Sequence, residues 1–128
     1  MSYDISLYRR DFLKRAMESG LGDWTDADPI PDDTIPALIA AIEAAGFVRF
    51  AGHKPYSKEG WGPWIEFTLD TPTMVAQVTV FPGEIGFNIP YGDLAGPSIE
   101  FCIQMASRLA IEHGLGFYDP QIPEAKYV

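Results

Sequence analysis

The stretch VAQVTVFPGEIGFNIP, residues 75–90, decides the fold class of this chain. Two runs typical of β-strands flank the pair Pro82-Gly83. Proline presets φ at the first central position of a turn, and glycine accepts the positive φ that the next position can require. We therefore predict an antiparallel hairpin. Because Pro90 cannot donate a ladder hydrogen bond, the second strand either ends there or lies at a sheet edge.

The segments around this hairpin continue the strand and helix pattern. Further strands are predicted at 3–8, 47–51, 64–69 and 115–118. Apolar residues at helical spacing predict three helices, within 9–20, 32–46 and 98–113. Asp33 or Thr34 can cap the second helix and Ser98 the third, while Gly20, Gly46 and Gly114 are suited to end them.

The resulting element order is βααββββαβ, with strands in a run and helices grouped towards the ends. This order predicts an α+β fold, in which an antiparallel or mixed sheet of about five or six strands carries helices on one face. The length of 128 residues and the lack of internal repeats or linkers predict one domain, residues 1–128.

Composition limits the compartment and the partners. A single cysteine cannot form an internal disulfide, and no segment has the apolar length of a signal peptide or a membrane helix, so we expect a soluble cytoplasmic protein without membrane contact. Acidic residues outnumber basic ones 18 to 9, giving a formal charge of −9. This charge disfavours nucleic acid and favours a basic protein partner, chiefly through faster encounter.

The residues able to react have structural interpretations. Cys102 lies on the apolar stripe of the third helix and is expected to be packed in the core. His113 ends that helix, where an imidazolium interacts favourably with the helix dipole. The chain contains no phosphate-binding P-loop, dinucleotide fingerprint, Cys-x-x-Cys pair or His-Glu-x-x-His motif. The sequence therefore predicts a protein without enzymatic activity, cofactor or bound metal.

A long loop between the strands at 47–51 and 64–69 is the first candidate binding site. Its candidate contact residues are His53, Lys54, Tyr56, Lys58, Glu59, Trp61 and Trp64. Aromatic side chains supply contact energy at low entropic cost, so this composition favours an interaction surface. His53, Ser57 and Glu59 are residue types of a hydrolase, but no Gly-x-Ser-x-Gly elbow accompanies them.

An acidic loop before the second helix is the second candidate. It contains Asp23, Trp24, Asp26 and Asp28. Its spacing fails the calcium-loop pattern, because Pro31 stands where glycine is required and Ala37 where glutamate is required. We interpret it as a docking face for a basic partner.

The two ends of the chain carry a resemblance. YDISLYRRDF at 3–12 and RLAIEHGLGFYDPQ at 108–121, with the hairpin at 78–93 between them, resemble a loosely defined group of small bacterial proteins that are largely uncharacterised. Some members of such groups are thought to be immunity proteins that accompany secreted toxins. The resemblance implies recognition of a toxin, and it brings no catalytic residues. In GLGFYDPQ itself, each residue also has a structural task, since Gly114 ends a helix and Asp119-Pro120 ends a strand.

The functional prediction is a non-catalytic protein-binding module, of immunity type, that neutralises a basic bacterial toxin or effector. Two alternatives stay open. One is a small-molecule-binding protein or an unrecognised enzyme that uses the loop around His53. The other is a structural or self-associating protein, a homodimer in which the strand ending at Pro90 pairs with its own copy.

Overall fold

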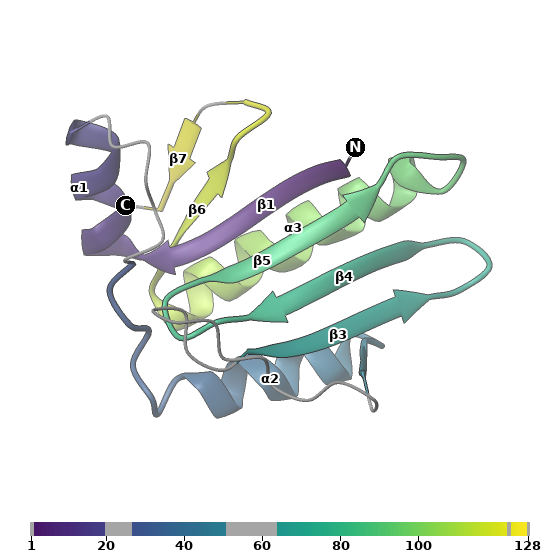
Figure 1. Ribbon diagram of the computed structural model, residues 1–128, viewed down its shortest axis with the longest axis horizontal. Helices are drawn as coiled ribbons and strands as arrows, with labels where there is room; N and C mark the ends of the chain where they lie inside the picture. Colours follow the sequence, from purple (N-terminus) through teal and green to yellow (C-terminus); the bar gives the residue numbers. More distant parts are fainter. Residues whose placement is uncertain (1, 20–26, 51–63, 123, 128) are drawn as a thin grey trace.

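A computed structural model describes residues 2–19, 27–50, 64–122 and 124–127, and the chain forms a sheet with three helices (Figure 1). The strands are β1 Ser2–Arg9, β2 Val48–Arg49, β3 Ile65–Asp70, β4 Val75–Val80, β5 Ile85–Pro90, β6 Leu115–Asp119 and β7 Glu124–Lys126. The helices are α1 Arg10–Ser19, α2 Ile35–Ala44 and α3 Ala95–His113. The element order agrees with the predicted order except for one additional strand, β7, at the end.

The sheet has seven strands in the order β2-β3-β4-β5-β1-β6-β7, and every neighbouring pair is antiparallel. The predicted α+β class is therefore confirmed, while the predicted count of five or six strands was too low. β7 is only three residues long, too short for an alternating pattern to be recognised in the sequence.

The hairpin at 75–90 forms as predicted, with Val80 opposite Ile85. Its turn differs from the expectation, because Gly83 does not have a positive φ. Glycine is needed there for space: a Cβ on Gly83 would lie 2.6 Å from the carbonyl oxygen of Ala27. The backbone N–H of Ile30 also donates to the Pro82 carbonyl at 2.8 Å, so the segment before α2 packs directly on this turn.

The strand that ends at Pro90 lies inside the sheet, between β4 and β1. The expectation that it offers an edge for pairing with a second copy was therefore wrong. Pro90 is tolerated because it is the last residue of β5, opposite Ser2 at the start of β1. Among the described residues, the edges of the sheet are β2 and β7.

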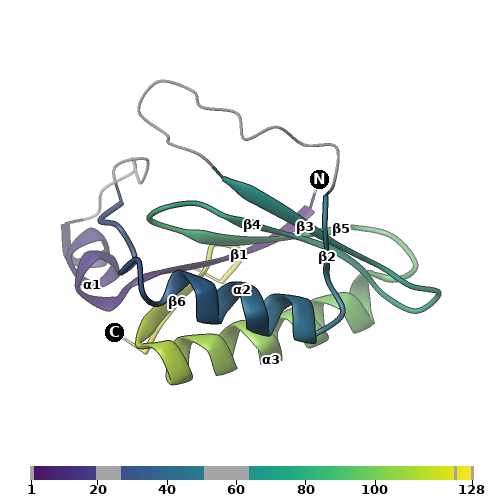
Figure 2. The ribbon, with the colours of Figure 1, turned by 90° about the horizontal axis from the view of Figure 1, so that it is seen from below.

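Helices α2 and α3 lie side by side on one face of the sheet, which we call the inner face (Figure 2). Helix α1 lies beside the end of the sheet that β1, β6 and β7 form (Figure 1). The inner-face core includes Ile5, Leu7, Leu38, Ile42, Phe67, Val78, Phe87, Met105, Leu109 and Phe117. These side chains alternate along each strand with residues of the opposite face, as a sheet covered on one side requires.

The two ends of α3 test the capping residues that the sequence predicted. Gly114 follows its last residue in the left-handed conformation, with φ 68°, as predicted. The helix begins at Ala95, three residues earlier than the predicted cap, Ser98. The Ser98 hydroxyl donates to the Leu94 carbonyl at 2.6 Å and accepts the N–H of Val75 at 2.9 Å. Ser98 therefore ties α3 to β4. None of the described helices is both long and apolar enough to cross a membrane.

Candidate functional site

The sheet face opposite α2 and α3, which we call the outer face, carries polar residues in two rows. The strand register places Glu66, Thr79, Gly86, Ser6 and Tyr118 side by side across β3, β4, β5, β1 and β6. It places a second row one step along the strands, formed by Thr68, Gln77, Asn88 and Asp4. A strand face built from hydroxyls, amides and carboxylates contributes little to a core, so these rows are candidates for recognition.

Charge is divided between the two faces of the sheet. The outer face presents four carboxylates. The strand register places Asp4, Glu66 and Asp70 there, and the hydrogen bond from Ser6 places Glu84 there. The basic residues of the described strands fall on the inner-face positions, opposite apolar partners: Arg9 pairs with Leu115, Arg49 with Phe67 and Lys126 with Phe117. No lysine or arginine of the described strands therefore occupies an outer-face position.

Two of these cations are already engaged on their own side. The Arg49 guanidinium lies 5.5 Å from the centroid of the Phe67 ring and 3.6 Å from the Glu43 carboxylate of α2. The Lys126 ammonium lies 5.8 Å from the centroid of Phe117. Neither of these two cations therefore lies on the outer face.

Glu84 is a half-buried carboxylate of the outer face. It lies at the end of the hairpin turn, and its side chain passes over Gly86, where an added Cβ would be 3.7 Å from Oε2. The Ser6 hydroxyl donates to Oε2 at 2.8 Å. Burial raises the pKa of Glu84, while hydrogen bonds from Ser6 and Tyr8 act in the opposite direction. Burial and the charge of Glu84 together raise the pKa of Tyr8.

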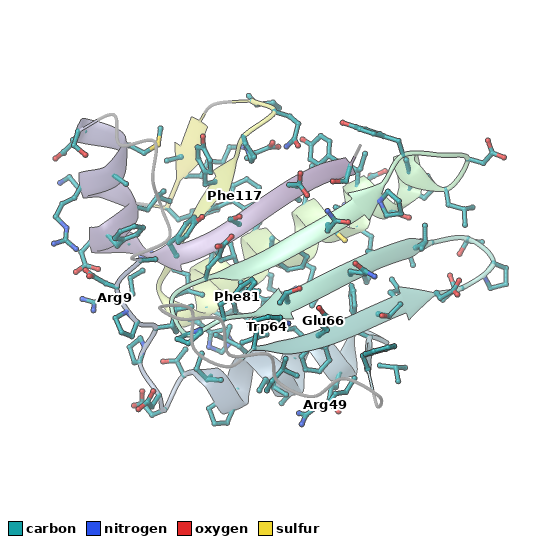
Figure 3. The ribbon with its side chains drawn as sticks, viewed as in Figure 1. Arg9, Arg49, Trp64, Glu66, Phe81 and Phe117 are labelled. Carbon is teal, nitrogen blue, oxygen red and sulfur yellow. The ribbon has the colours of Figure 1, made fainter. Side chains whose placement is uncertain are left out.

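An aromatic and acidic group lies at the β3 end of the first row (Figure 3). Trp64 donates its indole N–H to the Glu66 carboxylate at 3.3 Å, and its ring centroid lies 5.9 Å from that of Phe81. Trp64 is half-buried and is the one residue of the predicted aromatic loop within the described chain. It borders the outer face, as a contact residue of that face should.

The remaining candidate residues of the two loops mostly lie outside the described residues. This holds for His53, Lys54, Tyr56, Lys58, Glu59 and Trp61, and for Asp23, Trp24 and Asp26. Asp28 is described: its carboxylate forms an ion pair with Arg15 of α1, so a nearby cation already balances its charge.

The two chain ends that carry the family resemblance meet in the structure. The Tyr3 hydroxyl donates to the Asp119 carboxylate, and the Gln121 side chain donates to the other oxygen of Asp119 at 2.5 Å. Gln121 also binds both backbone groups of Asp4, accepting from N–H at 2.9 Å and donating to C=O at 2.7 Å. Burial and the Asp119 carboxylate raise the pKa of Tyr3 to about 12. The motif residues therefore join the first strand to the end of β6.

Cys102 is fully buried in the core as predicted, and burial raises the pKa of its thiol to about 12. A thiol in this environment stays protonated at neutral pH and is a poor nucleophile. Among the described residues, no group of three histidine, cysteine, aspartate or glutamate side chains converges in a way that could hold a metal ion.

A groove of about 300 Å³ lies between α2 and α3, on the helical side of the molecule. Its walls are Ala41, Ala44, Ala45, Phe101, Met105 and Leu109, with Arg108 and Glu112 at its rim. The groove is shallow and apolar and brings together no pair of groups with evident chemistry.

The fold and the outer face define an α+β protein with an acidic sheet surface. Comparison of the chain with protein-family models, with curated proteins and with solved structures found no match. Sequence reasoning missed Ser6, Glu84 and Glu66 as site residues, although Gly86 within a strand is a signal of close approach by another group.

Proposed function

We propose that this protein is a non-catalytic binding module that recognises a basic protein through the outer face of its sheet. The observation that carries the proposal is the division of charge: the outer face presents four carboxylates, and the strand cations occupy inner-face positions. Such a surface attracts a basic partner, accelerates its encounter and rejects acidic competitors. Trp64 at the border of this face adds the kind of aromatic contact that often dominates binding energy.

An immunity-type role is the concrete form of this proposal. It is supported by the resemblance of the chain ends to small bacterial proteins of that kind and by the acidic charge of −9. The partner would be a basic toxin or effector, and the complex would block it by occupying its surface. A neighbouring gene for such a toxin is the expected genomic context, and a context without any secreted effector would count against this role.

The test is affinity capture from a lysate of the source cells, with identification of the captured protein by mass spectrometry. Wild-type protein should retain a basic protein at low salt and release it at about 0.5 M salt, where the Debye length falls below about 5 Å. The double variant Asp4→Lys/Glu66→Lys should lose this capture. Glu100→Lys/Glu112→Lys changes the net charge equally but on α3, and it should retain capture.

Two results would contradict the proposal. One is the same capture by both double variants, whether kept or lost, because the position of the charge on the outer face would then not decide binding. The other is capture of an acidic partner that survives high salt. Circular dichroism and thermal unfolding of each variant establish that it is folded before capture is compared.

A further inference from the structure

We propose that two copies of this chain associate through their helical sides, with the α3 helices crossing at the groove between α2 and α3. This inference goes beyond the proposed function, because it concerns the side of the sheet opposite the outer face. The groove has a volume of about 300 Å³ and apolar walls from both helices. Figure 2 shows that no described element covers the side of α2 and α3 that faces away from the sheet. The groove is therefore open to a second molecule.

The exposed surface of α2 has the composition of a contact surface. A helix that faces water usually carries charged residues on its exposed side. Helix α1 follows this rule, and its exposed residues include Asp11, Lys14, Arg15 and Glu18. The exposed residues of α2 are instead Pro36, Ala37, Ala40, Glu43 and Ala44. The Glu43 carboxylate lies 3.6 Å from the Arg49 guanidinium, so the only charge of α2 is already balanced.

Two opposite charges at the rim of the groove identify the second molecule as another copy of this chain. Arg108 and Glu112 lie one turn apart on α3, both are exposed, and neither takes part in an ion pair among the described residues. When two α3 helices cross in antiparallel orientation about a two-fold axis level with Ala110, Arg108 of each copy lies opposite Glu112 of the other. The rim is therefore complementary to itself, as a two-fold symmetric interface requires.

The net charge of the molecule also favours this side. Two copies that each carry a formal charge of −9 repel one another at long range. The outer face would place four carboxylates of one copy near four of the other, whereas the rim of the groove carries one cation and one anion. The described edge strands, β2 and β7, are two and three residues long and offer little backbone for pairing between copies.

Ile111 provides an apolar contact for the same arrangement. It lies between the rim residues in sequence and is 59% exposed, which is unusual for isoleucine. In the antiparallel crossing, Ile111 of each copy lies level with Leu109 of the other, and Leu109 lines the groove. Removing these apolar side chains from water supplies the driving force for association, and the rim charges fix its register.

The test is sedimentation equilibrium of the full-length chain at about 5–500 µM, the range in which a weak dimer forms. The average mass should rise with concentration from 14.2 kDa towards twice that value. Arg108→Glu and Glu112→Arg should each weaken the dimer at least about tenfold, because like charges then meet across the axis. An equimolar mixture of these two variants should restore the dimer, because each contact again joins opposite charges. Ile111→Asp should also weaken it at least about tenfold.

Matched controls come from α1, where Lys14 and Glu18 are exposed and are also one turn apart. Lys14→Glu and Glu18→Arg change the net charge by the same amounts as the α3 variants and should leave the dimer unchanged. Circular dichroism and thermal unfolding establish that each variant is folded. Three results would overturn the inference: a wild-type protein that stays monomeric at every concentration, equal weakening by the α1 and α3 variants, or a mixture that dimerises no better than its components.

The outcomes separate this inference from the proposed function. Each copy in the dimer keeps its own outer face on the side away from the contact, so capture of a basic protein does not require the dimer. Glu100→Lys/Glu112→Lys should therefore still capture the basic protein although its dimer is weakened. A monomeric wild-type protein that captures a basic protein would overturn only this inference, and a dimer that captures none would overturn only the proposed function.

Discussion

Asp119 and Ser98 are the two polar side chains that the described part of the chain buries almost completely. Both act as hydrogen-bonding junctions between elements that are distant in sequence. Ser98 connects α3 to β4, and Asp119 connects the end of β6 to Tyr3 of β1. A buried polar group is costly unless its hydrogen bonds are satisfied, so these residues contribute to stability only with their partners in place.

Replacement of Asp119 by asparagine should destabilise the fold. The Asp119 carboxylate accepts from the Tyr3 hydroxyl at one oxygen, and from the backbone N–H and side chain of Gln121 at the other. Asparagine would remove the charge that strengthens these hydrogen bonds, and its NH₂ group would have to donate to the Tyr3 hydroxyl, which now donates to the carboxylate. We expect a loss of about 1.5–3 kcal/mol in the free energy of unfolding, measured by urea denaturation.

Two variants calibrate this measurement. Tyr3→Phe removes a single donor and should cost about 1 kcal/mol. Asp93→Asn makes the same chemical change at an exposed position and should stay within about 0.5 kcal/mol of wild type. An Asp119→Asn protein as stable as Asp93→Asn would show that the hydrogen bonds of the Asp119 carboxylate contribute nothing to the free energy of unfolding.

At the scale of elements, the β4–β5 hairpin organises both faces of the sheet. Its turn receives the segment before α2 through the bond from Ile30 to Pro82, which helps to place α2 on the inner face. The residue that leaves the turn, Glu84, reaches back over the outer face to Ser6 of β1. One hairpin therefore positions a core helix on one side and the candidate site on the other.

Two glycine-to-alanine changes should move stability in opposite directions. Gly83→Ala places a Cβ 2.6 Å from the Ala27 carbonyl oxygen, so the backbone must shift, and we expect a loss of about 1–3 kcal/mol. Gly96→Ala in the first turn of α3 meets nothing within 4 Å, and the reduced entropy of the unfolded chain should stabilise by up to about 1 kcal/mol. Thermal unfolding of both proteins tests the pair, and a Gly83→Ala protein at least as stable as Gly96→Ala would contradict the close approach.

At the scale of the whole molecule, the first strand of the chain lies inside the sheet. β1 pairs with β5 on one side and with β6 on the other, so the sheet cannot be completed until distant parts of the chain meet. Pairing between residues far apart in sequence costs loop-closure entropy before the contacts of the paired strands can offset that cost. The bonds of Gln121 to both backbone groups of Asp4 extend this pairing beyond β6.

Amide hydrogen exchange should report this arrangement directly. Amides of β1 and β5, which have a strand on each side, should exchange only through global unfolding. Amides of β2 and β7 at the edges should exchange through local opening, at least about tenfold faster. Exchange followed by NMR at neutral pH provides the measurement, and β1 amides as unprotected as those of β7 would contradict the topology.

The acidic loop and the aromatic loop illustrate the limit of prediction for the site. The sequence pointed to both because charge and aromatic content are visible in a local window. The rows of the outer face combine residues from five strands, and nothing in a local window shows that Ser6 and Glu84 face each other 78 positions apart. Only the pairing of β1 with β5, which places Ser6 opposite Gly86, brings Ser6 within reach of the Glu84 side chain.

What the sequence determined by itself was local. The hairpin at 75–90, the end of β5 at Pro90, the glycine that ends α3 and the buried faces of α2 and α3 follow from alternation, helical period and the backbone limits of proline and glycine. Each of these depends on a few neighbouring residues.

Only the tertiary structure decided the strand order, the interior place of β1, the separation of charge between the faces and the junction at Asp119. These depend on which distant segments pair, and the energy that selects one pairing is summed over the whole core. Tyr3 and Asp119 are 116 positions apart, and their contact exists only because β1 and β6 became neighbours in the completed sheet.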